Sequence, residues 1–425
     1  MPLTALLEKL YARRRFGIRP GVDRVSSLLA TLGNPEKQFR SIHVVGTNGK
    51  GSTSAFLSSV LKCAGHRTAQ FSSPHLVRFS ERFRIDGIEC PTDKLASNLE
   101  AVLDAAPEEA TFFEITTALA ALLFSGENIE LAVIEAGMGG RSDATAAICG
   151  EMTIITPIAI DHSEYLGETL QEIAYEKAGI VEPFTKIVSA EQHDAVREVI
   201  KKKSRAANSP LTLMGADFSA NWNQHGTLDY HGISRSLIGL VPGIPGRYQA
   251  QNAALALAAA EMLDSTGTVV DSDSLARGVT GVYWPGRMEL IPGNPPMLLD
   301  GAHNPAGSVA LAEALLDYPC KRLLLVTGVC SDKDIEQMYA PLIPLVDLIF
   351  TVTPSIDRAL DAEELSRLFS AKGVVSWPCD TVVKGIQKAR SESGAGDMIL
   401  VCGSLFIVGE TKAWLEETDY SGIRG

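Results

Sequence analysis

The sequence predicts an α/β protein of two domains, the first with a large and mostly parallel sheet and the second smaller. The chain has 425 residues, which is long for a single hydrophobic core. Short apolar runs that end in polar loops alternate with helix-like segments, as in a parallel sheet with helices on both faces. Proline and glycine become dense around residues 282–296, which indicates a linker between the domains.

The first domain is expected to alternate strands and helices up to this linker. The expected strands are the apolar runs 41–46, 130–137 and 152–160. The expected helices are one that ends near Gly65, a buried one at 111–126, and one rich in alanine and leucine that begins near residue 246. Between about 185 and 245 the pattern changes to short β-like pieces and loops.

The second domain is expected to begin directly after the linker. Its strands are expected in MLLDGAHNP (297–305), LLLVTGV (323–329), LIFTV (348–352) and MILVCGS (398–404). The sequence therefore divides into a first domain at 1–286, a linker at 287–296 and a second domain at 297–425.

Composition and charge exclude several classes of protein. Apolar residues make up 45% of the chain and charged residues 21%, as in a globular protein. The net charge of −13 argues against a broad nucleic-acid surface, which needs clustered Lys and Arg. Seven scattered cysteines without a CxxC spacing fit a reducing compartment. The first 20 residues lack the pattern of a signal peptide and no run of 18 apolar residues occurs, so a cytoplasmic protein without membrane partners is expected.

The stretch HVVGTNGKGSTS (43–54) has the order strand, glycine turn and helix start. This order points free backbone N–H groups and the helix dipole at an anion. The glycines let the backbone approach phosphate oxygens, Lys50 supplies a positive charge, and a hydroxyl of Ser52 or Thr53 can reach Mg²⁺. The spacing differs from the common G-x-x-x-x-G-K-[ST] loop, so a tight turn with a solvated lysine is the alternative.

Further motifs occur along the chain in a fixed order. They are GTNGKGST (46–53), FSSPHLVRFSERFRIDG (71–87), VIEAGMGGRSDATA (133–146), DHSEYLG (161–167), EKAGI (176–180), WPGR (284–287), LDGAHNP (299–305) and DKD (332–334). Together they closely resemble the folylpolyglutamate synthase/dihydrofolate synthase family of the Mur ligase superfamily, in its bacterial bifunctional type, from about Phe16 to Gly409. The resemblance implies a P-loop ATPase-like first domain and a Rossmann-like second domain.

The resemblance implies sites for ATP and for two Mg²⁺ ions. The expected ATP-binding residues are Gly46, Thr47, Asn48, Gly49, Lys50, Gly51, Ser52, Thr53, Asn252, Arg287 and Asp300. The expected metal ligands are Ser52, Ser73, Glu135 and His162. Glu135 ends an apolar strand, where a carboxylate suits a hard cation, and Arg287 has the planar fork suited to a γ-phosphate. A turn serine, a helix-capping glutamate and a hydrogen-bonded loop histidine are the alternatives for Ser73, Glu135 and His162.

Other residues are assigned by the same resemblance. Lys177 matches a lysine that CO₂ carbamylates (N6-carboxylates), with an exposed helix lysine as the alternative. Asp161 and Arg82 are expected at the folate or pterin site, although a salt-bridged surface loop is an equal alternative for the run Arg78, Arg82 and Arg84. His303 and Ser404 are expected at the glutamate site, Lys333 near an anionic intermediate or substrate, and the catalytic residues are Lys50, Lys177 and His303. Glu164 and Tyr165 stand where some relatives have aspartate and tryptophan, which leaves the pterin contact open.

The function implied is ATP-dependent ligation of L-glutamate to dihydropteroate, to folates, or to both. A carboxylate does not react with an amine in water, so it must first become an acyl phosphate, which closure of two domains would protect from water. Small-molecule substrates and a monomer are expected. Two alternatives stay open: a Mur-type ligase that adds an amino acid to a cell-wall precursor, and a nucleotide-regulated binding protein without ligase chemistry.

Overall fold

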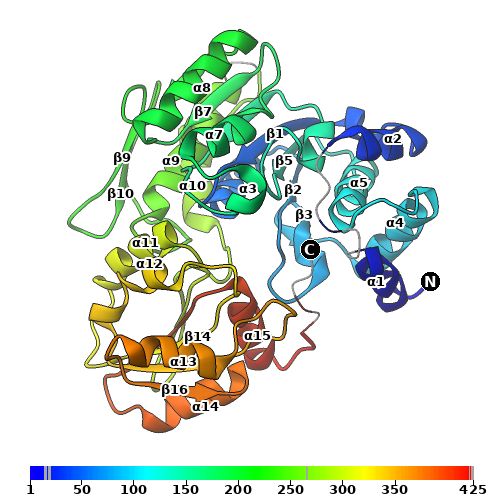
Figure 1. Ribbon diagram of the computed structural model, residues 1–425. Coiled ribbons are helices and arrows are strands. Elements are labelled where there is room, and N and C mark those ends of the chain that lie inside the picture. Colours follow the sequence, from blue (N-terminus) through cyan, green and yellow to red (C-terminus); the bar gives the residue numbers. More distant parts are fainter. Residues whose placement is uncertain (14–16, 18–20, 265–266, 421, 423–425) are drawn as a thin grey trace.

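A computed structural model describes residues 1–13, 17, 21–264, 267–420 and 422, so Phe16, where the resemblance begins, lies outside the described residues. Two α/β units are visible in Figure 1, a larger one coloured blue to green and a smaller one coloured yellow to red. The predicted α/β fold class is confirmed. In the described part of the chain no helix is both long enough and apolar enough to span a bilayer.

The larger unit is built on an eight-stranded sheet in the order β4-β3-β2-β5-β1-β6-β7-β8. Six strands pair in parallel, in the order β2, β5, β1, β6, β7 and β8. The strands β3 and β4 are added antiparallel at the β2 edge. The strand bounds are β1 (Arg40–Val45), β2 (Thr68–Phe71), β3 (Phe83–Ile85), β4 (Ile88–Glu89), β5 (Leu131–Glu135), β6 (Met152–Ile155), β7 (Lys186–Ser189) and β8 (Leu211–Leu213).

Helices cover both faces of this sheet because its strands are apolar on both sides. Alternate residues of β5 enter different cores: Leu131 and Val133 enter one, and Ala132 and Ile134 enter the other. The first core is closed by α3 (Lys50–Cys63), α9 (Gln249–Asp264) and α10 (Ser272–Gly281). The second is closed by α1 (Leu3–Ala12), α2 (Asp23–Thr31), α4 (Thr92–Ala105) and α5 (Phe112–Ser125). A third core lies under α6 (Ser163–Leu166), α7 (Leu170–Ala178) and α8 (Asp194–Ala207).

The segment expected to hold only β-like pieces and loops differs in part from the prediction. It contains β7, β8 and a three-stranded antiparallel sheet of β9 (Ser219–Trp222), β10 (Leu228–His231) and β11 (Ser236–Leu240), but also the helix α8. The expectation of loops was wrong for 194–207, because only Val196, Ile200 and Ala207 of this helix are buried and its other positions are mostly polar.

The smaller unit is built on a six-stranded sheet in the order β12-β13-β17-β14-β15-β16. The strands are β12 (Glu289–Ile291), β13 (Met297–Leu299), β14 (Leu323–Thr327), β15 (Leu348–Val352), β16 (Ser376–Cys379) and β17 (Met398–Cys402). The helices are α11 (Pro305–Leu315), α12 (Ile335–Tyr339), α13 (Ala362–Ala371), α14 (Val382–Glu392) and α15 (Leu405–Leu415). Residues 289–291, part of the expected linker 287–296, pair antiparallel with β13 and so belong to this sheet.

Short 3₁₀ turns connect several of these elements, at η2 (Pro35–Gln38), η3 (Phe79–Arg82), η4 (Ala144–Ala147) and η5 (Ile343–Leu345). The loop between β2 and η3 reaches from the larger unit to the smaller one, where Leu76 and Val77 join a core that includes Ile407 and Val408 of α15. The loops that follow β1 and β6 in one sheet and β13 in the other also meet, through the side chains of Asn48, Asp161 and Asn304. This edge is where open parallel sheets bind ligands.

Candidate active site

The glycines of the loop between β1 and α3 allow contacts that no side chain would permit. Gly46 has φ +147, and a Cβ there would lie 1.9 Å from Thr156 Oγ1. Gly49 has φ +88, and a Cβ there would lie 2.2 Å from Asn252 Oδ1. The helix α3 begins at the next residue, Lys50, so its first N–H groups face the loop as in an anion-binding turn.

Lys50 folds back over this loop. Its Nζ donates to the carbonyl oxygens of Gly46 and Thr47, at 3.3 Å each. The Thr47 hydroxyl in turn is held by Ala159, since the Thr47 Oγ1 donates to the Ala159 carbonyl and accepts from the Ala159 N–H, both at 3.0 Å. The loop is thereby fixed to the segment that follows β6, and the Lys50 ammonium lies against its backbone.

The remaining loop hydroxyls lie at the start of α3. Ser52 and Thr53 are both buried, and Thr53 Oγ1 has no hydrogen-bond partner among the described residues. Gly51 faces the cleft, where a Cβ would come within 3.1 Å of Trp284 Nε1 and 3.5 Å of Glu135 Oε2. Asn252 lies beside Gly49 and donates from Nδ2 to Gln249 Oε1 at 2.8 Å.

Glu135 and Ser73 form an oxygen-rich corner of this cleft. Glu135 ends β5, is 5% exposed, and accepts a 3.3 Å hydrogen bond from the Ser73 N–H. Burial raises the pKa of Glu135 to about 7, although Lys50, the Ser73 N–H and Arg287 act in the opposite direction. A buried carboxylate next to serine hydroxyls suits Mg²⁺, which prefers oxygen ligands and keeps several from water or substrate phosphates.

These protein groups alone do not enclose a cation. Among the described residues no group of three or more His, Cys, Asp or Glu side chains is placed to hold a metal ion. Glu135 and Ser73 lie together and offer only part of a coordination shell, which fits a metal that shares its ligands with a nucleotide, and the role of Ser52 as a ligand stays a prediction. The residues present therefore fit the expected metal at this corner.

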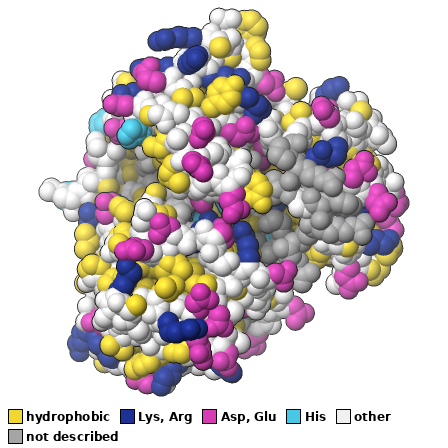
Figure 2. Space-filling view, viewed as in Figure 1, with side chains coloured by type: hydrophobic (Ala, Val, Ile, Leu, Met, Phe, Trp, Pro, Cys, Tyr) yellow, Lys and Arg dark blue, Asp and Glu magenta, His cyan; other side chains and the backbone are white. Residues whose placement is uncertain are grey.

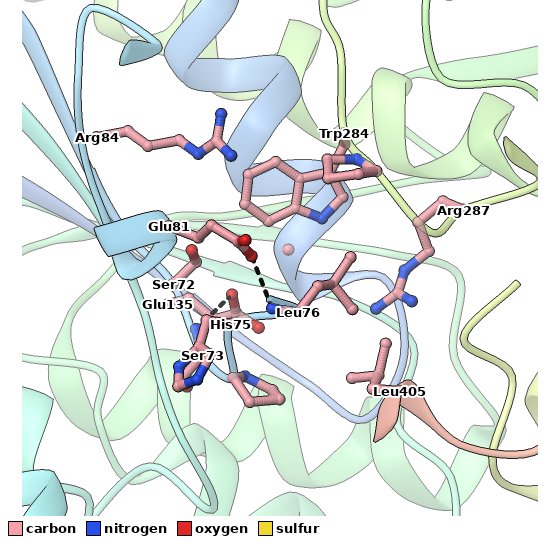
Figure 3. A pocket seen from close by; sticks show the side chains of 13 residues that line it. Ser72, Ser73, His75, Leu76, Glu81, Arg84, Glu135, Trp284, Arg287 and Leu405 are labelled. Carbon is pink, nitrogen blue, oxygen red and sulfur yellow. Dashed lines mark hydrogen bonds between the residues drawn. The ribbon is translucent and has the colours of Figure 1, made fainter. Parts of the chain in front are cut away.

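The cleft itself contains about 450 Å³ of empty space, part of it open to solvent. Figure 3 shows Trp284 and Arg84 on one side of it, Arg287 on another, and Ser73 close to Glu135. The Arg84 guanidinium lies 5.2 Å from the centre of the Trp284 ring. Trp284 was not among the residues predicted for the site. Its position three residues before Arg287, in a segment otherwise rich in proline and glycine, is the signal that was available.

The three arginines expected near the folate site have different environments. Arg82 is 1% exposed, donates from Nε to His75 Nδ1 at 2.8 Å, and lies over the rings of Phe79 and Phe112. Burial lowers the pKa of Arg82 to about 10. Of the three, Arg84 lines the cleft and Arg82 does not.

Arg78 fits the alternative of a salt-bridged loop. Its guanidinium lies 2.9 Å from Glu89 Oε1 and 3.3 Å from Glu416 Oε2, and 46% of the side chain is exposed. The second of these ion pairs joins the larger unit to the end of α15.

Asp161 is the centre of a charged cluster between the units. It accepts from Lys333 Nζ at 2.8 Å and from Asn304 Nδ2 at 3.1 Å, and the Nε2 atoms of His162 and His303 lie 3.9 and 3.8 Å from its Oδ2. Burial alone would raise the pKa of Asp161, but the two histidines and Lys333 outweigh it and hold the pKa below its ordinary value. Asp161 is therefore an anion, placed where both units contribute its partners.

The two histidines of this cluster are neutral near pH 7 and become positive only in acid, the range in which Asp161 would take up its proton. Burial lowers the pKa of His162 to about 4 and also lowers that of His303. His303 Nδ1 lies 2.8 Å from the Gly301 carbonyl, which only accepts, so Nδ1 carries the proton and Nε2 is left as an acceptor. A neutral imidazole is the form that binds a metal or accepts a proton.

Lys177 is buried beneath the phosphate loop. It is 4% exposed, and its Nζ donates to the Gly46 carbonyl at 2.8 Å. Burial and the neighbouring Lys50 lower the pKa of Lys177 to about 7. The alternative of an exposed helix lysine is therefore wrong.

The second unit contributes an amide pair that faces the phosphate loop. Asn304 Nδ2 donates to Asn48 Oδ1 at 2.9 Å, and Asn48 Nδ2 donates to Asn304 Oδ1 at 3.1 Å. Asn304 also caps α11, because its Oδ1 accepts from the Gly307 N–H at 2.8 Å. A single side chain thus links the phosphate loop to the start of a helix in the other unit.

Asp300 and Ser404 make structural contacts. Asp300 Oδ2 accepts from the Tyr248 hydroxyl at 2.8 Å and from the Met288 N–H at 3.0 Å, and its Oδ1 accepts from the Ala302 N–H at 2.9 Å. Ser404 is buried and caps α15. Their expected roles toward ribose and glutamate stay predictions.

Two α/β units that meet over a phosphate loop, with acidic and neutral imidazole groups beside it, define a nucleotide-dependent enzyme of the Mur ligase kind. The comparisons agree, since the Mur ligase middle domain matches residues 44–260 and the Mur ligase glutamate ligase domain matches residues 286–405. The dihydrofolate synthase/folylpolyglutamate synthase of Bacillus subtilis is 33% identical over 96% of this chain and 97% of its own length. The chain belongs to the folylpolyglutamate synthase/dihydrofolate synthase family.

Other similar proteins differ in length or in bound ligands. The chain spans about half, 52%, of a Halobacterium salinarum protein named probable bifunctional folylpolyglutamate synthase/dihydropteroate synthase, with 34% identity over 96% of this chain. The structure of Escherichia coli FolC with DHPP and ADP superposes with a TM-score of 0.89, 30% identity and 98% coverage of both chains. A Yersinia pestis enzyme named bifunctional folylpolyglutamate synthase/dihydrofolate synthase, with AMPPNP and a Mn ion, gives a TM-score of 0.88, 29% identity and 98% coverage of both.

Proposed function

We propose that the protein joins L-glutamate to dihydropteroate, to (tetrahydro)folates, or to both, at the expense of ATP and through an acyl phosphate, with ADP and phosphate as products. The observation that carries this proposal is the contact between the Asn48 and Asn304 amides. It places the loops of the second unit directly over the phosphate loop, where a nucleotide and a second substrate would meet. Relatives of nearly the same length carry both folate synthase names, so neither a cell-wall ligase nor a binding protein is favoured.

The chain's own groups would assist each step. Lys50 and Arg287 offset negative charge while the substrate carboxylate attacks the γ-phosphorus of ATP and ADP leaves. The amine of glutamate then attacks the acyl carbon, phosphate leaves, and the amine gives up a proton for which His303 Nε2 is an available acceptor. Lys333 and Asp161 hold the two units together around the acyl phosphate and keep water away.

We propose that Ser52, Ser73 and Glu135 would hold one Mg²⁺ ion and His162 a second, and that Lys177 would be N6-carboxylated. Bound Mg²⁺ neutralises charge on the transferring phosphoryl group. A lysine pKa of about 7 supports carboxylation, because only the neutral amine reacts with CO₂. The carbamate would supply a negative charge beside the metals where an ammonium would be repelled.

We further propose a cytoplasmic monomer that acts on small molecules, without nucleic-acid or membrane partners. The cysteines are unpaired, which fits a reducing compartment. On the face seen in Figure 2, Lys and Arg side chains are scattered among Asp and Glu and form no broad basic area. The molar mass of the purified protein, measured by light scattering, tests whether it is a monomer.

Phosphate release measured with ATP, Mg²⁺ and glutamate tests the function. Dihydropteroate, a reduced folate and a muramoyl nucleotide are compared as the third substrate. We expect phosphate release with dihydropteroate and with the reduced folate. Release with the reduced folate but not with dihydropteroate would restrict the enzyme to tail extension. Release with the muramoyl nucleotide alone would overturn the folate assignment, and nucleotide binding without any glutamate-dependent release would support the binding protein.

Isotope transfer tests the acyl phosphate. A folate-type substrate that carries ¹⁸O in its reacting carboxylate should deliver one labelled oxygen to the released phosphate. Direct hydrolysis of ATP takes its oxygen from water, so unlabelled phosphate during turnover would exclude the intermediate.

A further inference from the structure

The segment of residues 283–289, here the hinge turn, carries two residues of the cleft between the units. Trp284 and Arg287 both line that cleft, next to Glu135. Gly286 between them has φ +69, and a Cβ there would come within 2.9 Å of Val408 Cγ1 and 3.0 Å of Leu76 Cδ1. The hinge turn is therefore packed between the two units.

The Glu289 carboxylate accepts hydrogen bonds from within this turn and from α15. Glu289 Oε2 accepts from the Gly286 N–H at 2.7 Å, and Glu289 Oε1 accepts from the Tyr283 hydroxyl at 2.9 Å. The same Oε1 accepts from Lys412 Nζ of α15 at 2.8 Å. The Glu289 and Lys412 side chains are 13% and 9% exposed, so the ion pair is largely shielded from water. Hydrogen bonds to an ionised group in such surroundings are stronger than neutral ones.

Arg287 lies between two anchored neighbours. The Gly286 N–H is held by Glu289, and the Met288 N–H is held by Asp300 Oδ2 at 3.0 Å. The guanidinium also packs against the second unit, since a Cβ on Gly301 would lie 1.9 Å from Arg287 Nη1. The direction in which Arg287 leaves the backbone is thus set by carboxylates that do not themselves line the cleft.

We propose that Glu289 and Lys412 are positioning residues that aim Arg287 at the terminal phosphate of the nucleotide. The inference rests on the proposed function, in which Arg287 offsets charge on the γ-phosphate. The Glu289 carboxylate fixes the near end of the hinge turn, and Lys412 holds that carboxylate in place. Because Lys412 belongs to α15, the orientation of the Arg287 side chain depends on the position of the smaller unit relative to the larger one.

The test is nucleotide binding by calorimetry with Mg²⁺ present, using ADP and the non-hydrolysable analogue AMP-PNP. Glu289→Gln keeps the shape of the side chain but removes its charge, and Lys412 retains Glu416 at 3.4 Å. We expect the preference for AMP-PNP over ADP to fall roughly tenfold, because a misplacement of about 1 Å can cost up to about 10² where contact geometry is precise, and the guanidinium here is shifted rather than removed. Tyr283→Phe is the second variant, for use if Glu289→Gln does not fold. It removes one hydroxyl donor to Glu289 and should lower the preference for AMP-PNP by a smaller factor.

A double variant and a matched control variant distinguish an effect on the position of Arg287 from an effect on the stability of the fold. Arg287→Ala should lose the AMP-PNP preference, and adding Glu289→Gln to it should cause no further loss. Asp397→Asn is the control, because Asp397 also accepts from a glycine N–H, that of Gly394 at 2.8 Å, and from a cation, Arg322 at 2.6 Å, outside the cleft. It should lower the melting temperature without changing the nucleotide preference.

Each outcome decides the inference. An unchanged preference in Glu289→Gln, an equal loss in Asp397→Asn, or a further loss in the Arg287→Ala background overturns it. An unchanged preference in Arg287→Ala overturns it too, since Glu289 would then have nothing to position. Failure of the proposed function shows separately, as absence of glutamate-dependent phosphate release in the unaltered chain.

Discussion

Replacement of Lys177 is the sharpest test of the site. The side chain is 4% exposed and its Nζ donates to the Gly46 carbonyl at 2.8 Å, directly under the phosphate loop. With its pKa lowered to about 7, a large fraction of the amine is neutral at pH 7 and able to attack CO₂, forming an N–C bond and releasing a proton. The proposed carbamate would carry the negative charge that the proposed metal pair needs.

Two variants should therefore lose activity for the same reason. Lys177→Ala would remove the charge of the proposed carbamate, and loss of one well-placed electrostatic group typically costs about 3–4 kcal/mol of transition-state stabilisation, or roughly 10²–10³ in kcat. Lys177→Arg should be no better, because a guanidinium stays positive and does not take up CO₂. Lys202→Ala, at an exposed position of α8, is the control and should leave the rate unchanged.

Rescue and spectroscopy distinguish a carbamate from a structural lysine. Acetate or formate should restore part of the Lys177→Ala rate by replacing the missing carboxylate, while chloride at equal ionic strength should not. A ¹³C NMR carbamate signal should appear with ¹³C-bicarbonate in the unaltered protein and be missing in Lys177→Arg. A Lys177→Arg enzyme with near-normal kcat would refute the reasoning.

The remaining predictions concern the loop, the core and the metal. Gly46→Ala should destabilise the chain by more than the roughly 1–3 kcal/mol of a strained backbone, because its Cβ would overlap Thr156, whereas Gly65→Ala, with φ +91 and open space, should show the strain alone in thermal melts. Burial lowers the pKa of His43 to about 4, so the unfolded chain binds the extra proton first and stability should fall by up to about 3 kcal/mol as the pH drops from 6.5 to 4. His43→Gln should flatten that dependence in denaturation curves, and an equally steep curve would contradict the assignment. Chelation with EDTA should abolish ATP-dependent phosphate release, and Mg²⁺ or Mn²⁺ should restore it; activity that persists would argue against a metal requirement.

The alternation of apolar runs and helical segments was sufficient to predict the two sheets. The run 41–46 is buried from Ser41 to Val45 because its strand is covered on both faces. The helix α8 escaped prediction because its polar residues outnumber the three that it buries. The strand β12 was not predicted, because Glu289–Ile291 lies among prolines and glycines and is a strand only through pairing with β13.

For the site, motifs were sufficient to name the loops but not to orient their side chains. Arg82 and Arg84 are two residues apart, yet the first ends the 3₁₀ turn η3 and points into an aromatic core while the second, in β3, faces the cleft. Linear spacing does not report such a change of backbone geometry. The burial of Lys177 likewise depends on a loop that is 131 residues away in the chain.

The pairing of Asn48 with Asn304 has a consequence for how the enzyme is made. The two amides are separated by 256 residues, and Lys333 is separated from Asp161 by 172. Contacts of such sequence separation form late, after the local structure on which they depend. During refolding, far-UV circular dichroism should therefore recover before phosphate release does, with a populated species in which both sheets are complete and the catalytic cleft has not yet assembled.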